Sequence, residues 1–173
     1  VLVANLPYNV SVPVLLHFLE SFPYLQRGVV MVQAEVGERL AAPPGSKTYG
    51  APSAKAAWYG RWWLAGTVSR QVFWPVPNVD SVLVAFERAP EPRGTEDERR
   101  AAFRLVDAAF QQRRKMLRQA LAGVLRESAP DGGADSISAA DASALLERAG
   151  VAPTARGEEL TIDDFARIAD SLR

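Results

Sequence analysis

Val1-Leu2-Val3-Ala4-Asn5-Leu6-Pro7-Tyr8 is the stretch around which this chain is organised. It begins as a short apolar run with β-branched side chains, and the run stops at a polar turn that contains a proline. This pattern is typical of a buried strand, and open α/β sheets bind their ligands in the crevice where such strands end. We therefore expect the chemistry of the protein at Asn5 to Tyr8.

The residue types in this turn indicate a pocket for an amine. Pro7 fixes its own φ and restricts Leu6 to extended geometry, so the nearby carbonyls are held in defined directions. Asn5 adds an amide oxygen, and Tyr8 adds a flat aromatic face. Hydrogen-bond acceptors beside a stacking face suit the exocyclic amine of an extruded adenine. A turn with only a structural role explains the tetrapeptide equally well when it is taken alone.

Composition narrows the possible classes of protein. The chain has 173 residues, 48% of them hydrophobic, and a formal net charge of zero. An argument for nucleic-acid binding must therefore rest on local clusters of basic residues. It has no Cys, and its one histidine, His17, lies in an apolar helical run, so no metal site is expected. Neither a membrane span nor a signal peptide is evident, and we expect a cytoplasmic protein with no membrane partner.

Strands and helices alternate at the start of the chain. Residues 12–22 place apolar side chains on one stripe at helical spacing, and Ser11 is the expected N-cap of that helix. Residues 28–32 form a second continuous apolar strand. Strand, helix and strand in this order predict a βαβ unit, with a parallel strand pair and helices on both faces of the sheet.

The next segment is expected to be mostly irregular. Residues 36–42 are predicted as a short helix, and residues 42–47 as a loop rich in proline and glycine. We interpret residues 48–59 as a continuation of this loop. Lys47 and Lys55 make it basic and are candidate RNA contacts, while an ordinary connecting role is an equal alternative.

A β-hairpin is expected after this loop. Residues 61–68 and 79–86 both have β composition, and short connections predict that they pair antiparallel at the edge of the sheet. Between them lies Phe73-Trp74-Pro75-Val76-Pro77, whose two prolines oppose both helix and central strand pairing. The segment is predicted to be a rigid extended loop that presents Phe73 and Trp74.

The clearest linker is Ala89-Pro90-Glu91-Pro92-Arg93-Gly94, after which the chain becomes charged and helical. We predict an α/β domain at residues 1–90 and a small all-α domain at residues 91–173. In the second domain, residues 130–136 are an expected loop, and further helices are expected at residues 138–149 and from Thr161 onward.

Basic residues concentrate in this second domain. Thr95 and Glu98 match a capping box, and the long helix predicted to follow has a core stripe made of Phe103, Val106, Phe110, Leu117 and Leu121. Between residues 99 and 118 there are seven basic residues and one acid. Such an excess on a helix can follow an RNA backbone, although a solvated helix face is the alternative. The candidate contacts are Arg113, Arg114, Lys115 and Arg118.

Four signatures in order resemble the ribosomal RNA adenine N6-dimethyltransferases of the KsgA type, over nearly the whole chain. They are Asn5-Leu6-Pro7-Tyr8, Phe73-x-Pro75-x-Pro77-x-Val79-x-Ser81, Phe110-x-x-Arg113-Arg114-Lys115-x-Leu117, and Arg156-x-Glu158-Glu159-Leu160-Thr161 with Phe165. The resemblance implies a Rossmann-like methyltransferase domain that uses S-adenosylmethionine, followed by a helical domain. It also implies N6-dimethylation of two adjacent adenines in the 3′-terminal hairpin of small-subunit ribosomal RNA, with the immature 30S particle as the partner.

The resemblance also assigns roles to residues. Tyr8 and Phe73 resemble the two aromatic residues that enclose the flipped adenine. Asn5 and a backbone carbonyl of Leu6-Pro7 would hold its amine, and Asn5 is the one candidate for contact with the cofactor. These five positions, Asn5, Leu6, Pro7, Tyr8 and Phe73, form the expected catalytic site.

The sequence departs from the family pattern at its start. No Gly-x-Gly cofactor loop precedes Asn5, and the chain begins at Val1, inside the expected strand. We therefore expect a fragment that keeps the target-base half of a Rossmann-like sheet, with parallel strands and an antiparallel edge hairpin, and that is inactive alone. The unpaired edge at residues 1–4 predicts self-association.

Two alternatives remain open from sequence. One is a related methyltransferase of the same superfamily that acts on large-subunit ribosomal RNA, of the macrolide-resistance type, or on DNA or protein glutamine. The other is a non-catalytic RNA-binding or ribosome-assembly factor whose active surface is the basic segment at residues 113–118.

Overall fold

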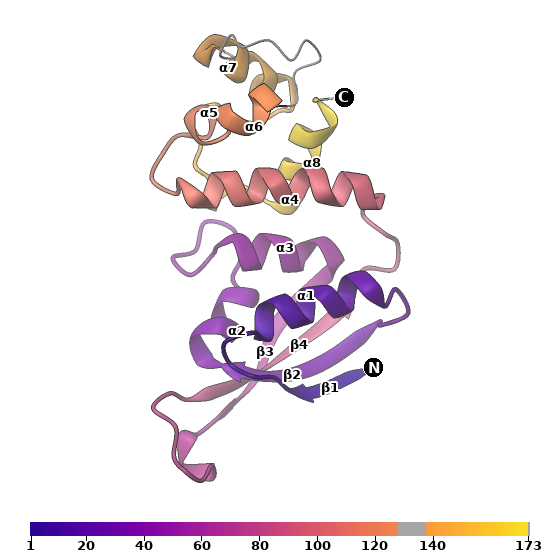
Figure 1. Cartoon of the computed structure of the whole chain (residues 1–173), viewed down its shortest axis with the longest axis vertical. Helices are drawn as coiled ribbons and strands as arrows, with labels where there is room; N and C mark the ends of the chain where they lie inside the picture. The colour runs from indigo at the N-terminus through magenta and orange to yellow at the C-terminus, as the bar shows by residue number, and fades with distance from the viewer. Residues whose placement is uncertain (128–137, 173) are drawn as a thin grey trace. The chain divides into compact units, whose positions relative to one another are not determined.

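A computed structural model describes residues 1–127 and 138–172 of the chain (Figure 1). The chain forms two compact units, Val1–Arg93 and Gly94–Arg173. The loop expected at residues 130–136 lies outside the described residues. Within the ranges that are described, no helix has the length and apolar character needed to cross a bilayer.

The first unit is built on a four-stranded sheet with the order β1-β2-β4-β3. Strands β1 (Leu2–Asn5) and β2 (Arg27–Gln33) pair in parallel, as the βαβ pattern predicts. Strands β3 (Gly60–Val68) and β4 (Ser81–Arg88) form an antiparallel hairpin, and β4 also pairs antiparallel with β2. The mixed sheet with an edge hairpin is therefore confirmed.

Helices cover one face of this sheet. Helices α1 (Ser11–Ser21), α2 (Ala34–Leu40) and α3 (Ala51–Tyr59) pack above it in Figure 1. The strand residues beneath them are buried and form the core of the unit: Val30, Val32, Val82, Val84 and Phe86. The expectation of helices on both faces is wrong for this chain, because the described helices of the unit all lie on the side of these core residues.

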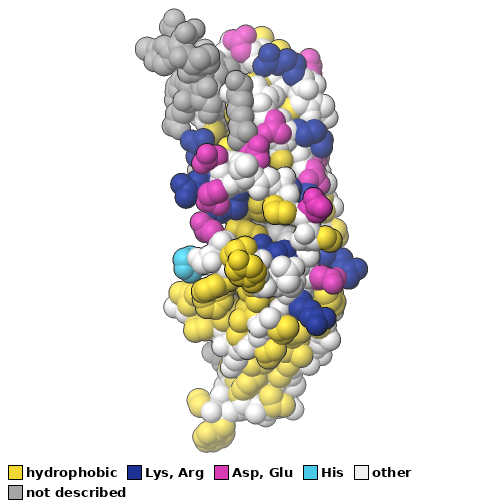
Figure 2. All heavy atoms as spheres, turned by 90° about the vertical axis from the view of Figure 1, so that its right-hand side faces the viewer, with side chains coloured by type: hydrophobic (Ala, Val, Ile, Leu, Met, Phe, Trp, Pro, Cys, Tyr) yellow, Lys and Arg dark blue, Asp and Glu magenta, His cyan; other side chains and the backbone are white. Residues whose placement is uncertain are grey.

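The opposite face of the sheet is open. One residue from each strand lies in the same register across this face and lines a shallow pocket of about 360 Å³: Val3, Val29, Ala85 and Trp63. The side chains at the ends of this row stay accessible, since Val3 is 80% and Trp63 is 38% exposed. Figure 2 shows hydrophobic side chains gathered over this unit on the side where the N-terminus lies.

Helix α3 occupies a segment that the sequence indicated to be a loop. The Gly50 amide donates to the Ser53 hydroxyl at 3.0 Å, which caps the helix, and Pro52 sits in its first turn, where proline is tolerated. The indole of Trp62 on β3 donates to the carbonyl of Ala56 at 2.8 Å. Small residues such as Ala54 let the helix approach the sheet closely. The helix is therefore buried although its sequence shows no clear stripe of large apolar residues.

Arg88, the last residue of β4, ties the sheet to the end of α1. Its guanidinium donates to the carbonyls of Leu19 at 2.6 Å, Leu25 at 2.8 Å and Phe22 at 3.3 Å. Carbonyls at a helix C-terminus lack partners within the helix, so a cation stabilises them. Burial lowers the pKa of Arg88 from its ordinary value.

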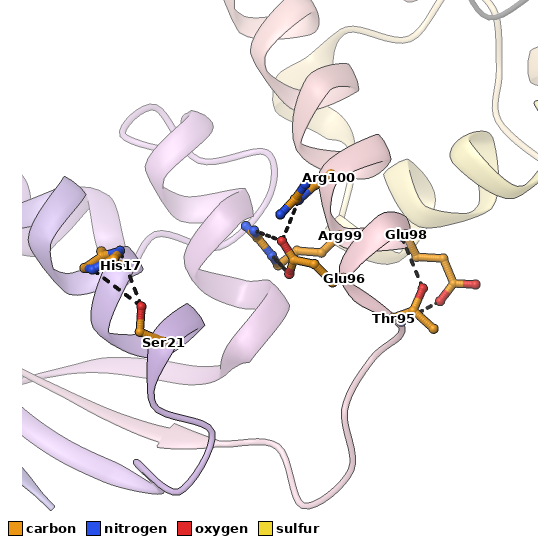
Figure 3. Close-up of polar contacts among 7 residues, drawn as sticks. All are labelled: His17, Ser21, Thr95, Glu96, Glu98, Arg99 and Arg100. Carbon is orange, nitrogen blue, oxygen red and sulfur yellow. Dashed lines mark hydrogen bonds and ion pairs between the residues drawn. The ribbon is translucent and has the colours of Figure 1, made fainter.

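The second unit is helical. It contains α4 (Glu96–Gln111), α5 (Leu117–Ala120), α6 (Ala122–Glu127), α7 (Ala139–Arg148) and α8 (Ile162–Asp170). Three helices of this unit begin with reciprocal capping boxes, at Thr95, Ser138 and Thr161. The sequence predicted the box at Thr95 and the helices that start near residues 138 and 161. In the first turn of α4, Glu96 accepts hydrogen bonds from Arg99 and Arg100 next to the Thr95 cap (Figure 3).

The long helix is shorter than predicted, and its core stripe differs. Helix α4 ends at Gln111, residues 112–116 form a turn, and α5 begins at Leu117. The side chains of Leu105 and Ala109 are buried, whereas Phe103 and Phe110 are only half-buried. The predictions of Val106, Leu117 and Leu121 as core residues are confirmed.

Candidate functional site

The end of β1 and the loop between β3 and β4 enclose one open pocket of about 480 Å³. The structure thus brings together two segments that are far apart in the sequence. Asn5, Leu6, Pro7 and Tyr8 line it from one side, and the connecting loop lines it from the other through Phe73, Trp74, Pro75 and Pro77. All five residues that the sequence indicates for catalysis are among these lining residues.

Backbone hydrogen bonds fix the turn that follows β1. The Leu6 amide donates to the carbonyl of Met31 on β2 at 3.2 Å, and the side chain of Leu6 is buried. The Val10 amide donates to the carbonyl of Pro7 at 3.3 Å. Because Pro7 also has a fixed φ, the turn offers its acceptors in defined directions.

Asn5 is an accessible polar group of the pocket. Its side chain is exposed, and its amide has no hydrogen-bond partner among the described residues. An amide oxygen in this state can accept a hydrogen bond from a ligand. Asn5 is also where β1 ends, and the Asn5 backbone pairs with Met31 on β2, which holds the base of the side chain in place.

The Tyr8 ring is held at its far end. Its hydroxyl lies 2.8 Å from the hydroxyl of Ser81, a fully buried residue at the start of β4. The backbone carbonyl of Tyr8 accepts from the Ser11 hydroxyl at 3.3 Å. Ser11 is the first residue of α1, and its hydroxyl supports the preceding turn. The expectation that the Ser11 side chain caps the helix is wrong.

The opposite wall is a loop braced by its own polar groups. The Arg70 amide donates to the Asp80 carboxylate at 3.0 Å, and the Arg70 guanidinium donates to the carbonyl of Asn78 at 3.2 Å. Phe73 is half-buried, whereas Trp74 is 94% exposed. The loop is therefore closed across its base and presents aromatic side chains at the pocket, as the two prolines indicated.

The expected RNA contacts lie elsewhere. Lys47 is exposed on the loop before α3, Lys55 is half-buried on α3, and neither lines the pocket. In the second unit, Arg113, Arg114 and Lys115 are exposed on the turn at residues 112–116, and Arg118 is half-buried on α5. The basic cluster is a turn rather than a helix face.

Part of this basic turn is already paired. The Arg113 guanidinium donates to the Glu158 carboxylate at 2.7 Å, and both residues belong to motifs that the sequence singled out. Arg113 therefore links two motifs of the second unit, which reduces its availability for phosphate. As for metals, the described parts of the chain hold no group of three or more His, Cys, Asp or Glu side chains that could bind an ion.

Comparison with known proteins decides the family. Residues 1–172 match the family model described as ribosomal RNA adenine dimethylase. The chain belongs to this family. A family member from Leifsonia xyli subsp. xyli, named ribosomal RNA small subunit methyltransferase A, is 65% identical over 168 residues, which are 97% of this chain and 56% of that protein.

A relative of the same name from Streptomyces coelicolor is 57% identical over 98% of this chain and 55% of its own length. The chain thus spans about half the length of the curated relatives it matches. The matched residues span both units.

Solved structures support the Rossmann-like fold of this adenine dimethylase family member. A dimethyladenosine transferase from Plasmodium falciparum aligns with a TM-score of 0.80 at 22% identity, over 96% of this chain and 65% of that one. The 23S rRNA methyltransferase ErmE aligns with a TM-score of 0.64 at 20% identity, over 98% of this chain and 64% of that one.

Proposed function

We propose that the protein carrying this chain uses S-adenosylmethionine to dimethylate the N6 atoms of two adjacent adenines in the 3′-terminal hairpin of small-subunit ribosomal RNA. The observation that carries this proposal is the pocket at the end of β1, which combines an unpartnered Asn5 amide with aromatic residues from two distant segments. Family membership and relatives named for the small-subunit enzyme support the choice of substrate.

The pocket residues recognise the base by its shape and by its amine. Tyr8 and Phe73 stack against the extruded adenine, and stacking is worth about 1–3 kcal/mol per base, comparable to the cost of unstacking it. The Asn5 amide oxygen and a carbonyl of Leu6-Pro7 accept hydrogen bonds from the two N–H groups of the amine. The fixed turn after β1 holds the backbone carbonyl before the base arrives, and strand pairing holds the backbone of Asn5, so only the Asn5 side chain must be ordered.

These acceptors also lower the barrier of the reaction. The lone pair of adenine N6 is delocalised into the ring, which makes the amine a poor nucleophile. Two acceptors out of the ring plane favour a pyramidal nitrogen whose lone pair points away from them. The same oxygens stabilise the positive charge that develops on nitrogen, so no general base is needed before attack.

S-adenosylmethionine supplies an electrophilic methyl group when it is bound. Among the described residues, the exposed amide of Asn5 is the candidate contact with it, and the 173-residue chain contains no Gly-x-Gly sequence. We therefore expect the isolated chain to bind S-adenosylmethionine weakly and to be inactive. Isothermal titration of the chain with this cofactor tests that expectation, and tight binding would contradict it.

RNA affinity comes mainly from the second unit in this proposal. Phosphates of the ribosomal RNA in the immature 30S particle are contacted by Arg114, Lys115 and Arg118. Arg113 contributes through the part of its side chain that the ion pair with Glu158 leaves accessible. Lys47 and Lys55 of the first unit are weaker candidates because neither lies at the pocket. A ribosomal RNA substrate agrees with a cytoplasmic location.

The deciding experiment compares substrates for the protein expressed from its complete gene. Immature 30S particles, 23S ribosomal RNA and duplex DNA are each incubated with S-adenosylmethionine, and nuclease fragments are analysed by mass spectrometry. We expect N6-dimethylation of two adjacent adenines near the 3′ end of the small-subunit RNA alone. Methylation of 23S RNA would instead support the macrolide-resistance type, and RNA binding without methylation would support an assembly factor.

A further inference from the structure

Ser81 is a buried hydroxyl that contacts the pocket only through another residue. It has no exposed surface and does not line the pocket, yet its hydroxyl lies 2.8 Å from the hydroxyl of Tyr8. Either hydroxyl can donate in this pair. It is the one hydrogen bond of the Tyr8 ring among the residues that the structure describes.

The backbone around Ser81 is fixed from both sides. As the first residue of β4, it pairs with Gln33 of β2 and with Val68 of β3. The carbonyl of its neighbour Asp80 accepts from the Ala34 amide at 3.0 Å. A serine in this position has few rotamers available, so its hydroxyl is a fixed reference point for the Tyr8 ring.

Ser81 also terminates the loop that supplies Phe73. The loop is closed across its base by the contact between Arg70 and Asp80, directly before Ser81. One end of the Tyr8 residue is held by Ser11, and the other end is held by Ser81. The start of β4 therefore connects the loop that carries Phe73 to the hydroxyl of Tyr8.

We propose that Ser81 is a positioning residue for methylation, which keeps the Tyr8 ring at the separation from Phe73 that a single nucleobase fills. This inference rests on the proposed function of the pocket. Without the hydrogen bond, the Tyr8 ring turns about its side-chain bonds, and a smaller fraction of bound RNA has its adenine stacked for reaction. The loss falls on kcat, because affinity for the RNA arises elsewhere.

The test is a double-mutant cycle of Ser81→Ala and Tyr8→Phe in the protein from its complete gene. Each single variant should lower kcat on immature 30S particles about three- to tenfold, with KM for the particle changed less than about twofold. The double variant should be no slower than the slower single variant, because both changes remove the same hydrogen bond. Effects that multiply, or a Tyr8→Phe variant as fast as the native protein, would overturn the proposal.

Ser53→Ala is the matched control. Ser53 is also a buried serine of the first unit, and it bonds to a backbone carbonyl away from the pocket, so its loss affects folding without touching Tyr8. Its kcat should equal that of the native protein. Thermal unfolding of all variants shows whether Ser81→Ala folds. If it does not fold, the kcat of Tyr8→Phe alone tests the proposal, because the Tyr8 ring is only half-buried and loss of its hydroxyl should leave the fold intact.

The failure of this inference differs from the failure of the proposed function. If Tyr8→Ala abolishes methylation while Tyr8→Phe and Ser81→Ala do not slow it, the pocket is catalytic and the hydrogen bond is irrelevant. If Tyr8→Ala leaves methylation intact, the proposed site itself is wrong.

Discussion

Asn5 combines an exposed amide with a backbone held in the sheet. Removing the amide should therefore affect chemistry without moving the rest of the pocket. We predict that Asn5→Ala lowers the single-turnover rate of the protein from its complete gene at least about 100-fold, the usual cost of losing a preorganised acceptor or donor. RNA affinity, measured by filter binding, should change less than about twofold.

Asn9→Ala is the control for this prediction, because Asn9 is also exposed but does not line the pocket. Its rate should match that of the native protein. A parallel loss of RNA affinity in Asn5→Ala would mean that Asn5 contributes general binding and not alignment of the amine.

Glu96 carries the clearest electrostatic signature in the second unit. Hydrogen bonds from Arg99 and then Arg100 lower its pKa from 4.5 to about 2. A depressed carboxyl pKa stabilises the folded state above pH 4.5, and this contribution is lost as the pH falls from 4.5 toward 2. Because Glu96 is 45% exposed, solvent screening keeps the gain below about 1 kcal/mol.

Carbon-detected NMR titration of the Glu96 carboxyl measures this shift directly. The midpoint should lie near 2 in the native chain and should rise in Arg100→Gln, which removes one of the two donors. A native midpoint close to 4.5 would show that the two ion pairs do not persist in solution.

Single-residue roles could be predicted where residue chemistry is local. Asn5 and Tyr8 were candidates from residue type alone, with a structural turn as an equal alternative, and only the family resemblance joined Phe73 to them. The structure places the three residues around one pocket. Ser81 was quoted within a motif, but its contact with Tyr8 joins residues 73 positions apart. Such a contact depends on the strand register, which cannot be read from the identity of a single residue.

Gly37 shows how closely helix α2 packs on the sheet. A Cβ atom added there would lie 2.2 Å from Val82 and 2.7 Å from Val84, so the helix would have to move. We predict that Gly37→Ala lowers the free energy of unfolding by about 1–3 kcal/mol, despite the better helix propensity of alanine. Urea denaturation of the chain measures the change.

Gly66→Ala, on strand β3 of the same unit, provides the comparison. Its added Cβ would have one neighbour, Leu83 at 3.7 Å, an ordinary contact, so stability should change by less than about 0.5 kcal/mol. Equal effects at the two glycines would contradict tight packing of α2.

The turn at residues 112–116 is the element on which RNA affinity is proposed to depend. Arg114 and Lys115 are exposed there, and each neutralised phosphate adds about 0.7 to 0.9 to the slope of log affinity against log salt concentration. The double variant Arg114→Gln, Lys115→Gln should weaken binding of small-subunit RNA and make this slope shallower by about 1–2. Fluorescence anisotropy at several salt concentrations measures both quantities.

Arg148→Gln is the control, since Arg148 is an exposed arginine of the same unit on helix α7. It should leave the salt slope unchanged. If it reduces affinity as much as the double variant, binding depends on total charge and not on the turn.

Elements were predictable where pattern and burial agree. Strand β2 was recognised because a continuous β-branched run suits a sheet interior, whereas β1, predicted as buried on the same ground, has Val3 80% exposed. The helix that follows Thr95 was recognised because Thr precedes an acid at fixed spacing. Helix α3 was missed because its alanines, Pro52 and Ser53 resemble a loop. The end of α4 was missed because apolar residues continue at helical spacing beyond Gln111, although the chain turns there to bring Leu117 to the carbonyl of Ala155.

At the scale of the whole chain, the sheet of the first unit keeps an open face and an open edge. Four strands in register carry Val3, Val29, Ala85 and Trp63 on the face that no described helix of the unit covers. Strand β1 pairs with β2 on one side only, and Val1 and Val3 are 81% and 80% exposed. An apolar strand edge of this kind is a template for pairing with another strand.

We predict that the 173-residue chain self-associates through β1. Light scattering should give a mass that rises from the monomer value as the concentration is raised, and Val3→Lys should restore the monomer because a charge at the edge opposes strand pairing. Val72→Lys is the control: Val72 is 69% exposed on the loop before β4, so the same change of side chain away from the edge should leave association intact. A native chain that stays monomeric at millimolar concentration would contradict pairing through β1, and equal effects of the two lysines would point to general hydrophobic attraction instead.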